Sequence, residues 1–348
     1  MFEKMGISLA QTGDYEVFIV AYPSTSNPSW EGIRFTSLHP FKRLSLARLM
    51  AKWNVFRQIW KLKPTILIFN THELLVPAVL LKVLMDVKIV YDVRENYYRN
   101  ILHSESFPRL LRWPLALMVR FKEKLLAPSV DHFFLAEKGY ETEFRFHRGG
   151  WTVIENKAQV SNLHGTRKRE HGKILLLFSG TLAESTGVFR AIELAKELHR
   201  LDESVTLTLV GHAALKNVRD RLQDEVRQHR WITLIGSDQL VPHQTVLAAI
   251  QQADAGILSY PYAHHTLNSH PTKLFEYLSA RLPIILENNW PWIEYYAACQ
   301  PFLFCDFSKP DGRILLAELK TKSFYTRTPE EVNWSSEAPR FLKSLENL

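Results

Sequence analysis

Two charged residues, three positions apart, have the types and spacing to bind a phosphorylated ligand. Lys273 and Glu276 lie in the stretch His270–Leu286, where Pro271 favours the first turn of a helix and Pro283 ends it before a β-rich run. Residues three apart share one helix face, and a helix N-terminus attracts anions. The ammonium suits a phosphate, and the carboxylate suits a ribose diol. An ordinary helix with a salt bridge between the two residues is the alternative.

This stretch resembles the PxKxxEY…PII signature in the second domain of GT-B glycosyltransferases of the large retaining family 4 (group 1) type. The resemblance implies that Glu276 holds the ribose hydroxyls of a nucleotide-sugar donor and that Pro271, Thr272 and Lys273 help to bind it. Family members more often carry a Glu-x7-Glu pair. Here Asn268 stands eight residues before Glu276, and its amide can bond a hydroxyl but adds no charge.

A second candidate element is a strand, a loop of small residues and a helix. The apolar run Lys173–Phe178 leads into the loop Ser179–Gly187, and such a loop offers backbone N–H groups to phosphate. The resemblance implies that this loop cradles the donor diphosphate and that Gly211 lies near the nucleobase. Its donor-binding residues would be Gly180, Thr181, Thr186 and Gly187.

Two positive charges that the family often carries in this loop are missing. Thr181 and Thr186 stand where Arg and Lys are frequent, so Lys273, with Arg190 as a second candidate, would have to supply the charge. Departure of a diphosphate requires its developing charge to be stabilised, and helix N-termini together with Lys273 suit that task. The sequence has no D-x-D pair of carboxylates for a metal, so we expect no metal site and no cofactor.

Two residues of the first half are candidates for catalysis. Arg94 lies in Asp92–Asn96, after the predicted strand Val87–Tyr91, and His72 follows the strand Thr65–Phe69. Open α/β sheets bind ligands at the carboxyl ends of their strands. Arg94 occupies the position of a family histidine, and a guanidinium pairs with phosphate but cannot act as a base. Purely structural roles for both residues remain the alternative.

The net charge of +7 is concentrated in the first half of the chain. Residues 1–157 hold 22 Lys and Arg against 15 Asp and Glu, whereas residues 158–348 hold 21 of each. Such an excess favours anionic lipid, polyphosphate or nucleic acid as a partner. No nucleic-acid recognition motif occurs, so we expect no nucleic-acid partner. Cys299 and Cys305 lack the companions of a zinc site and are expected to be free thiols.

The segment Phe41–Leu62 predicts a basic amphipathic helix. Trp53, Phe56 and Trp60 interleave with six basic residues, and the segment contains no acidic residue. This pattern favours peripheral binding to an anionic membrane surface. The alternative is a domain helix whose aromatic residues pack inward. No apolar run is long enough to cross a bilayer, and we expect a cytoplasmic protein, peripheral on the inner face of the plasma membrane if this helix binds lipid.

Strands alternate with helices along the whole chain, which predicts α/β architecture with parallel sheets. The expected organisation is a Rossmann-like acceptor domain over 1–157, a linker over 158–172, a Rossmann-like nucleotide-sugar domain over 173–328 and a C-terminal helix within 329–348 that crosses back to the first domain. The chain opens on a helix, Phe2–Ala10, where the family has a strand and a glycine-containing loop before this helix. Either the start of the chain has been placed late, or the first domain lacks its usual first strand.

The resemblance implies transfer of a sugar from a nucleoside diphosphate donor, UDP- or GDP-linked, to an acceptor hydroxyl with retention of configuration. The acceptor would be a saccharide or a lipid-linked saccharide in the synthesis of a cell-surface polysaccharide or lipid-linked glycan. Two other functions fit the same residues. One is a GT-B partner subunit that no longer catalyses, favoured by Thr181, Thr186 and Arg94. The other is a nucleotide-sugar epimerase of the same fold.

Overall fold

The structure of the chain is a computed structural model, and it describes residues 2–22, 29–41, 45–103, 107–144, 146, 149–159, 172–262 and 269–348. Contacts divide the chain into two compact units, which are described separately. The first comprises Met1–Asn156 and Trp334–Leu348, and the second comprises Lys157–Asn333. Most of the predicted linker, residues 160–171, lies outside the described residues.

The first unit is built around a parallel sheet of four strands in the order β3-β4-β5-β6. Parallel neighbours require crossover connections, which here contain helices. The elements of the unit are η1 (Phe2–Gly6), α1 (Ile7–Thr12), β1 (Val17–Ala21), β2 (Ile33–Ser37), α2 (Leu46–Leu62), β3 (Ile66–Phe69), α3 (Leu75–Leu84), β4 (Lys88–Val93), α4 (Tyr97–His103), α5 (Arg109–Leu126), η2 (Ala127–Ser129), β5 (His132–Leu135), α6 (Tyr140–Glu143), β6 (Gly150–Val153), η6 (Trp334–Ser336) and α13 (Ala338–Glu346).

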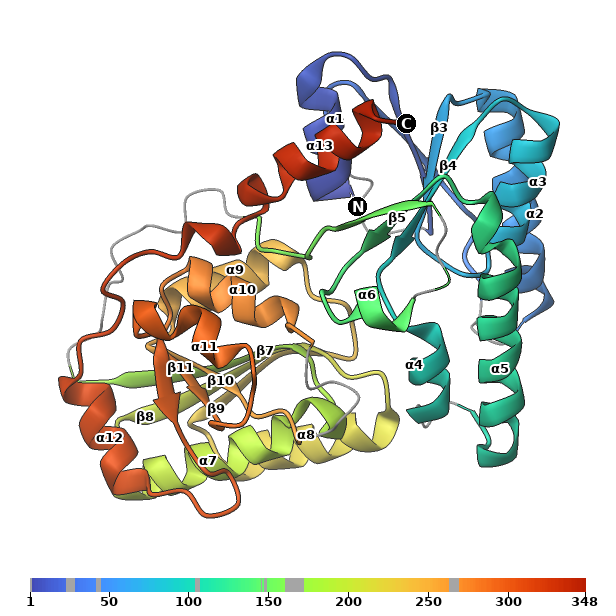
Figure 1. The fold of residues 1–348 in the computed structure, drawn as a ribbon. Helices are drawn as coiled ribbons and strands as arrows, with labels where there is room; N and C mark the ends of the chain where they lie inside the picture. Colours follow the sequence, from blue (N-terminus) through green and yellow to red (C-terminus); the bar gives the residue numbers. More distant parts are fainter. Residues whose placement is uncertain are drawn as a thin grey trace. The chain divides into compact units, whose positions relative to one another are not determined.

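Successive residues of the central strands point to opposite faces of this sheet, and each face is covered by helices (Figure 1). Tyr91 and Phe133 pack on the face that α2 and α3 cover. Val90 and Phe134 pack on the other face, against η1 and α13. A strand buried on both faces has an apolar sequence without alternation, which is why β4 and β5 were recognisable.

The C-terminal helix α13 is an integral part of the first unit. Phe341 is fully buried, and its ring centroid lies 5.4 Å from that of Phe134 on β5. Trp334 donates a hydrogen bond of 2.8 Å from Nε1 to Oγ of Ser8 in α1. The last fifteen residues of the chain therefore complete the cover of one sheet face.

Strands β1 and β2 form a separate parallel pair in which Val17 is opposite Ile33. Within the described residues, β1 pairs with β2 and β3 pairs with β4, and no strand pairing joins β1 to β3. The first unit thus contains two sheets in place of one continuous sheet.

The second unit contains a parallel sheet of six strands in the order β12-β11-β10-β7-β8-β9. Leu176 and Phe178 of β7 face a core that contains α7, and Leu177 faces a second core that contains α9 and α10. Its elements are β7 (Ile174–Thr181), η3 (Glu184–Thr186), α7 (Val188–Leu201), β8 (Val205–His212), α8 (Lys216–Gln228), β9 (Ile232–Ser237), α9 (His243–Gln252), β10 (Ala255–Leu258), α10 (Thr272–Ser279), β11 (Ile284–Leu286), α11 (Ile293–Tyr296), η4 (Ala297–Cys299), β12 (Phe302–Phe304), α12 (Gly312–Thr321) and η5 (Glu330–Val332).

Two helices differ from the sequence-based prediction. The sequence also predicts a helix over 137–146, but the described residues of this range contain only the four-residue α6, Tyr140–Glu143. Helix α4 was not predicted, although Asn96 supplies the usual capping signal, since its Oδ1 accepts a hydrogen bond of 3.2 Å from the backbone N–H of Arg99.

The sequence also predicts that no segment crosses a bilayer and that both cysteines are free thiols. No helix in the described part of the chain has both the length and the apolar character needed to span a membrane. Cys299 and Cys305 are buried free thiols, as predicted.

Candidate donor-binding site

Helix α10, which carries the Lys273/Glu276 pair, is held against the central strand of the second unit. Tyr277 is buried, and its hydroxyl lies 2.9 Å from Oγ of Ser179 and accepts a hydrogen bond of 3.2 Å from the Ser179 N–H. Its ring leaves no room for a side chain at Gly256 on β10, where a Cβ would stand 2.4 Å from the ring. These contacts fix the position of α10 relative to the end of β7.

Three glycines form a row across the carboxyl ends of adjacent strands. Gly180 of β7 is in register with Gly211 of β8, which is in register with Gly236 of β9. A Cβ on Gly211 would lie 1.7 Å from the carbonyl oxygen of Gly180, and one on Gly236 would lie 2.5 Å from that of Gly211. The backbones approach too closely for side chains, so this edge of the sheet presents bare peptide groups.

Lys273 lies beside the first glycine of this row. A Cβ on Gly180 would stand 3.8 Å from Cε of Lys273. Its Nζ lies 3.8 Å from the ring centroid of Phe178 and 5.0 Å from that of Tyr260. Only 6% of the residue is exposed, and Nζ has no hydrogen-bond partner within the described part of the chain.

The environment of Lys273 disfavours its charge in the absence of a ligand. Burial lowers the pKa of Lys273 from 10.5 to about 7, and the charge of Glu276 opposes this effect only in part. The two aromatic rings attract a cation through their faces but do not satisfy its N–H donors. A buried ammonium of this kind would gain strongly from an anionic ligand that supplies hydrogen-bond acceptors.

The carboxylate of Glu276 pairs with a histidine that was not predicted. His243, the first residue of α9, has Nε2 3.0 Å from Oε1 of Glu276, and the Glu276 side chain is 13% exposed. A carboxylate accepts hydrogen bonds, so the imidazole donates. The alternative prediction of a salt bridge between Lys273 and Glu276 is wrong, because Nζ of Lys273 has no such partner.

The loop after β7, predicted to cradle a diphosphate, forms a tight turn into α7, and its two threonines serve different purposes. The Thr186 hydroxyl lies 2.8 Å from the carbonyl oxygen of Thr181 and 2.9 Å from that of Ala183, and so closes the turn. Thr181 is exposed at the end of β7. Gly187, with φ of 81°, precedes α7, and a Cβ there would stand 1.8 Å from the carbonyl oxygen of Ser259.

Arg190, the second candidate for positive charge, is engaged elsewhere. Its guanidinium forms an ion pair with Glu287 and donates to the carbonyl oxygens of Ser259 and Tyr260 at 3.3 and 3.2 Å. These bonds join α7 to the ends of β10 and β11. Of the two predicted sources of charge, Lys273 is the one that this structure leaves without a hydrogen-bond partner.

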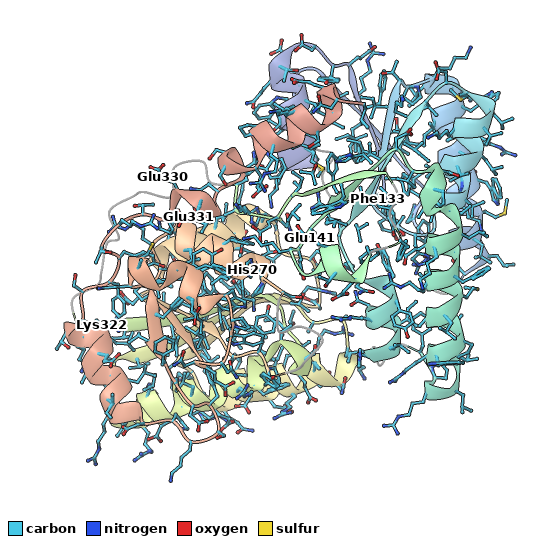
Figure 2. The ribbon with its side chains drawn as sticks, in the orientation of Figure 1. Phe133, Glu141, His270, Lys322, Glu330 and Glu331 are labelled. Atoms are coloured by element: carbon cyan, nitrogen blue, oxygen red, sulfur yellow. The ribbon has the colours of Figure 1, made fainter. Side chains whose placement is uncertain are left out.

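The residues just before α10 lie among aromatic rings. Pro271 caps the helix and Thr272 is its first residue. His270, labelled in Figure 2, has its ring centroid 5.7 Å from that of Phe275 and 6.1 Å from that of Trp292. Asn268, a predicted donor-binding residue, lies outside the described residues.

Arg94, a candidate for catalysis in the first unit, is part of a polar network at the ends of β4 and β6. It donates from Nε to Asp92 at 2.7 Å and from Nη1 to Oδ1 of Asn156 at 3.4 Å. Lys4 donates to the same Asn156 oxygen at 2.6 Å. The guanidinium is 21% exposed, and the buried Asp92 compensates its charge.

His72 lies in a basic cluster that the sequence did not indicate. Its Nδ1 is 2.9 Å from Nζ of Lys122 on α5, and its ring packs edge-on against Tyr97. Burial, and then the charge of Lys122, lower the pKa of His72 to about 4. The imidazole is therefore neutral near pH 7, and Nδ1 accepts from the ammonium of Lys122.

Sequence comparison gives a distant relationship. No family model matches the chain. Glycogen synthase of Mycobacterium tuberculosis is 26% identical over 205 residues, which cover 56% of this chain and 47% of that protein. The chain thus spans about half the length of the curated relatives it matches.

Several solved structures share the fold over nearly the whole chain. Sucrose-phosphate synthase from Thermosynechococcus elongatus has a TM-score of 0.68 at 13% identity, covering 98% of this chain and 90% of that one. Trehalose-6-phosphate synthase OtsA has a TM-score of 0.68 at 10% identity, with 99% and 94% covered. HepE of Anabaena, solved with UDP and glucose, has a TM-score of 0.60 at 13% identity, with 91% and 86% covered. These likenesses confirm the predicted GT-B fold and the resemblance to GT-B glycosyltransferases.

Proposed function

We propose that this chain is a glycosyltransferase that moves a sugar from a nucleoside diphosphate donor to an acceptor hydroxyl. The observation that carries the proposal is the buried ammonium of Lys273, which lacks a hydrogen-bond partner in the described chain and lies beside the bare peptide groups at Gly180. Few ligands suit a buried cation next to such a backbone row, and a diphosphate supplies both charge and acceptors.

The proposed donor pose assigns a role to each side of the site. The diphosphate would lie between Lys273 and the loop that ends at Gly187, at the N-terminus of α7, where the N–H of Val188 already donates to Ala183 and the later N–H groups of the first turn would face the ligand. The ribose would bond Glu276, and the nucleobase would lie along the glycine row toward Gly211. UDP is the first nucleotide to test, because HepE, which shares the fold, was solved with UDP.

In this pose, Lys273 would assist departure of the leaving group. As the bond between the sugar and the diphosphate breaks, negative charge grows on the phosphate oxygens, and a fixed cation nearby lowers the barrier. The charge comes from the protein, so we propose that the reaction proceeds without a divalent metal. We also propose retention of configuration, by front-face attack in which the leaving phosphate accepts the acceptor's proton.

A donor-hydrolysis screen over UDP-, GDP- and ADP-sugars tests the proposal. We expect release of the nucleoside diphosphate from one donor class, and no release by the Glu276→Gln variant. NMR of the transferred sugar reports its anomeric configuration. If the wild-type chain binds no nucleoside diphosphate in calorimetric titration, the proposal fails.

One observation favours a second function, that of a partner subunit which binds the donor but does not catalyse. Arg94 stands where the family has a histidine and is neutralised by Asp92, and Thr186 is used to close its own loop. Donor binding without hydrolysis or transfer, over all acceptors tried, would support this function over the first.

We propose further that the first unit binds an anionic membrane surface, where a lipid-linked acceptor would be reached. Helices α2, α3 and α5 form one layer on the sheet (Figure 1). They carry ten Lys and Arg and a single acidic residue, Glu123, which is buried. Trp113 and Phe121 of α5 are 63% and 67% exposed. Exposed apolar side chains within a basic layer suit an anionic bilayer.

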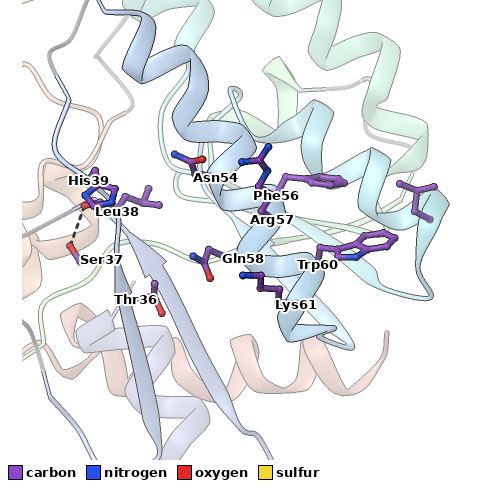
Figure 3. A pocket seen from close by; sticks show the side chains of 11 residues that line it. Thr36, Ser37, Leu38, His39, Asn54, Phe56, Arg57, Gln58, Trp60 and Lys61 are labelled. Carbon is purple, nitrogen blue, oxygen red and sulfur yellow. Dashed lines mark hydrogen bonds between the residues drawn. The ribbon is translucent and has the colours of Figure 1, made fainter.

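The predicted segment Phe41–Leu62 contributes to this layer. Trp53 and Trp60 of α2 are 37% and 43% exposed, whereas Ala51, Val55 and Ile59 form its buried stripe. The alternative that the aromatic residues pack inward therefore holds for Phe56, which packs against the core, but not fully for the two tryptophans. A hollow of 560 Å³ lies beside this helix, and its lining, drawn in Figure 3, includes Arg57, Trp60 and Lys61. Such a lining fits a lipid phosphate group.

A further inference from the structure

Lys122 of α5 is a half-buried cation whose partner is not a carboxylate. Its Nζ lies 2.9 Å from Nδ1 of His72, in the loop that follows β3. Burial lowers the pKa of Lys122, and the charges of two acidic residues oppose this effect only in part. The imidazole is neutral near pH 7, so it accepts a hydrogen bond from the ammonium but does not balance its charge.

The two acidic residues that act on Lys122 are held by other groups. The carboxylate oxygens of Glu73 accept from Nε of Arg48 on α2, at 3.1 and 3.4 Å. The buried Glu123 accepts from the Tyr91 hydroxyl at 3.1 Å, and its other oxygen lies 3.6 Å from an arginine of the same helix. Neither carboxylate forms an ion pair with Lys122 in the part of the chain that the structure describes. The ammonium therefore has no negative charge in direct contact with it.

The N-terminus of helix α3 adds to the positive potential beside this pair. His72 stands three residues before Leu75, the first residue of α3. No side chain caps this helix, and its first turn contains no acidic residue. The peptide N–H groups at such an end attract anions. On the other side, the ring of Tyr97 packs edge-on against His72, with the ring centroids 4.7 Å apart, and fixes the imidazole.

We propose that Lys122 and His72 form a binding site for a phosphate monoester group. His72 orients the ammonium by accepting one of its three N–H groups, which leaves the other two for phosphate oxygens. A phosphate monoester carries about −1.5 to −2 charges at pH 7 and offers three acceptor oxygens, so it would gain most from this cation and the helix end. This inference goes beyond the proposed function and does not depend on it, because the donor diphosphate is assigned to the second unit.

Histidine-selective labelling and NMR report on this site itself, whatever binds to the second unit. The resonance of His72 is assigned with the His72→Gln variant, and the parent chain is titrated with inorganic phosphate at constant ionic strength. We expect a saturable shift of the His72 resonance. Lys122→Met should weaken the phosphate affinity at least about tenfold, as expected for the loss of a charged hydrogen bond.

The matched control is Lys124→Met, which removes an equal charge from an exposed position of the same helix and should leave the affinity unchanged. Lys122→Arg keeps the charge and should retain binding, and the other histidine resonances show whether each variant is folded. A His72 resonance that does not move with phosphate would overturn the proposal. An equal loss of affinity in Lys122→Met and Lys124→Met would also overturn it, because the effect would then come from the general charge of the helices.

Two further arms distinguish a soluble ligand from a lipid headgroup. Glycerol 3-phosphate is a soluble monoester, and a shift of the His72 resonance at lower concentration than with inorganic phosphate would assign the site to a soluble molecule. Vesicles that contain phosphatidic acid present the same group on a surface. Co-sedimentation that Lys122→Met loses and Lys124→Met keeps would assign the site to a lipid headgroup.

Discussion

The imidazole of His243 orients the carboxylate of Glu276 from a different helix, at 3.0 Å between Nε2 and Oε1. One residue opens α9 and the other lies within α10. If Glu276 binds ribose, His243 restricts the carboxylate to one rotamer before the donor arrives, and less side-chain freedom is lost on binding.

Replacing His243 should therefore weaken donor binding without removing it. We expect His243→Ala to raise the Kd of UDP about fivefold, the effect of one ordinary hydrogen bond of about 1 kcal/mol, and His243→Gln to recover part of the loss. Calorimetric titration measures both. Tighter binding by the alanine variant would mean that His243 competes with the ribose.

Replacing Glu276 should have a larger effect. Glu276→Ala removes a charged acceptor for ribose hydroxyls, and bonds of this type contribute about 1.5 to 3 kcal/mol, so the Kd of UDP should rise roughly 10- to 150-fold. Circular dichroism and the unfolding temperature should stay close to the parent values. An unchanged Kd would contradict the ribose assignment.

Replacing Lys273 should separate stability from binding. Lys273→Met replaces a buried charged side chain with an uncharged one of similar volume. The variant should therefore bind nucleoside diphosphate much more weakly than the parent. At pH 6 it should nevertheless unfold at a higher temperature. Binding of the nucleoside without phosphates should change little. Denaturant unfolding and calorimetry provide both measurements.

The stability difference between Lys273→Met and the parent should depend on pH. The pKa of Lys273 in the folded protein, about 7, lies below 10.5, so between these values the unfolded chain binds more protons than the folded protein. The stability of the parent therefore gains from Lys273 as pH rises above 7, and the advantage of the methionine variant should shrink. A difference that stays constant from pH 6 to pH 9.5 would contradict the assigned burial of the charge.

The loop glycine Gly187 should not tolerate a methyl group. A Cβ there would stand 1.8 Å from the Ser259 carbonyl oxygen, so Gly187→Ala should cost more than about 3 kcal/mol of unfolding free energy. Gly172→Ala is the matched control, because Gly172 has a similar φ of 86° but nothing within 4 Å of a Cβ. It should cost about 1 to 2 kcal/mol. Equal costs would show that backbone conformation, and not the close approach to Ser259, decides the effect.

The proposed membrane face should lose lipid binding when its apolar side chains are removed. We expect the parent chain to co-sediment with phosphatidylglycerol vesicles at low salt and to be released by salt, which screens charges over about 8 to 10 Å at physiological strength. The double variant Trp113→Ser, Phe121→Ser should remain in the supernatant. Leu240→Ser, at an exposed site of the second unit, is the control and should bind as the parent does. Parent protein that never sediments would refute the membrane proposal.

Local sequence was sufficient for most strands and for the helix that carries Lys273 and Glu276. A strand that is buried on both faces has a continuous apolar sequence, which can be recognised. Helix α10 can be recognised because Pro271 stands just before it and Pro283 just after it. Spacing alone could not decide whether Lys273 and Glu276 pair with each other. The answer depends on Phe178 and Tyr260, which lie outside helix α10 and reach Lys273 through the packing of β7 and β10.

The partners of the candidate residues were not predictable for the same reason. His243 lies 33 residues before Glu276, and Lys122 lies 50 residues after His72, so neither pair leaves a periodic signal. Thr186 shows a different limit. A hydroxyl suits a phosphate and a neighbouring carbonyl equally well, and only the geometry of the turn assigns it to the carbonyl.

Because α13 belongs to the first unit, the order of synthesis and the order of folding differ in this protein. The second unit is continuous in sequence, and all of its residues are synthesised, and leave the ribosome, before Trp334–Leu348. The first unit, although most of it is synthesised earlier, keeps Phe134 and Val90 without the part of their cover that α13 supplies until Phe341 arrives. During translation, the later-made unit can therefore reach its final packing first, and the half-covered sheet of the earlier unit is the part most in need of protection from aggregation.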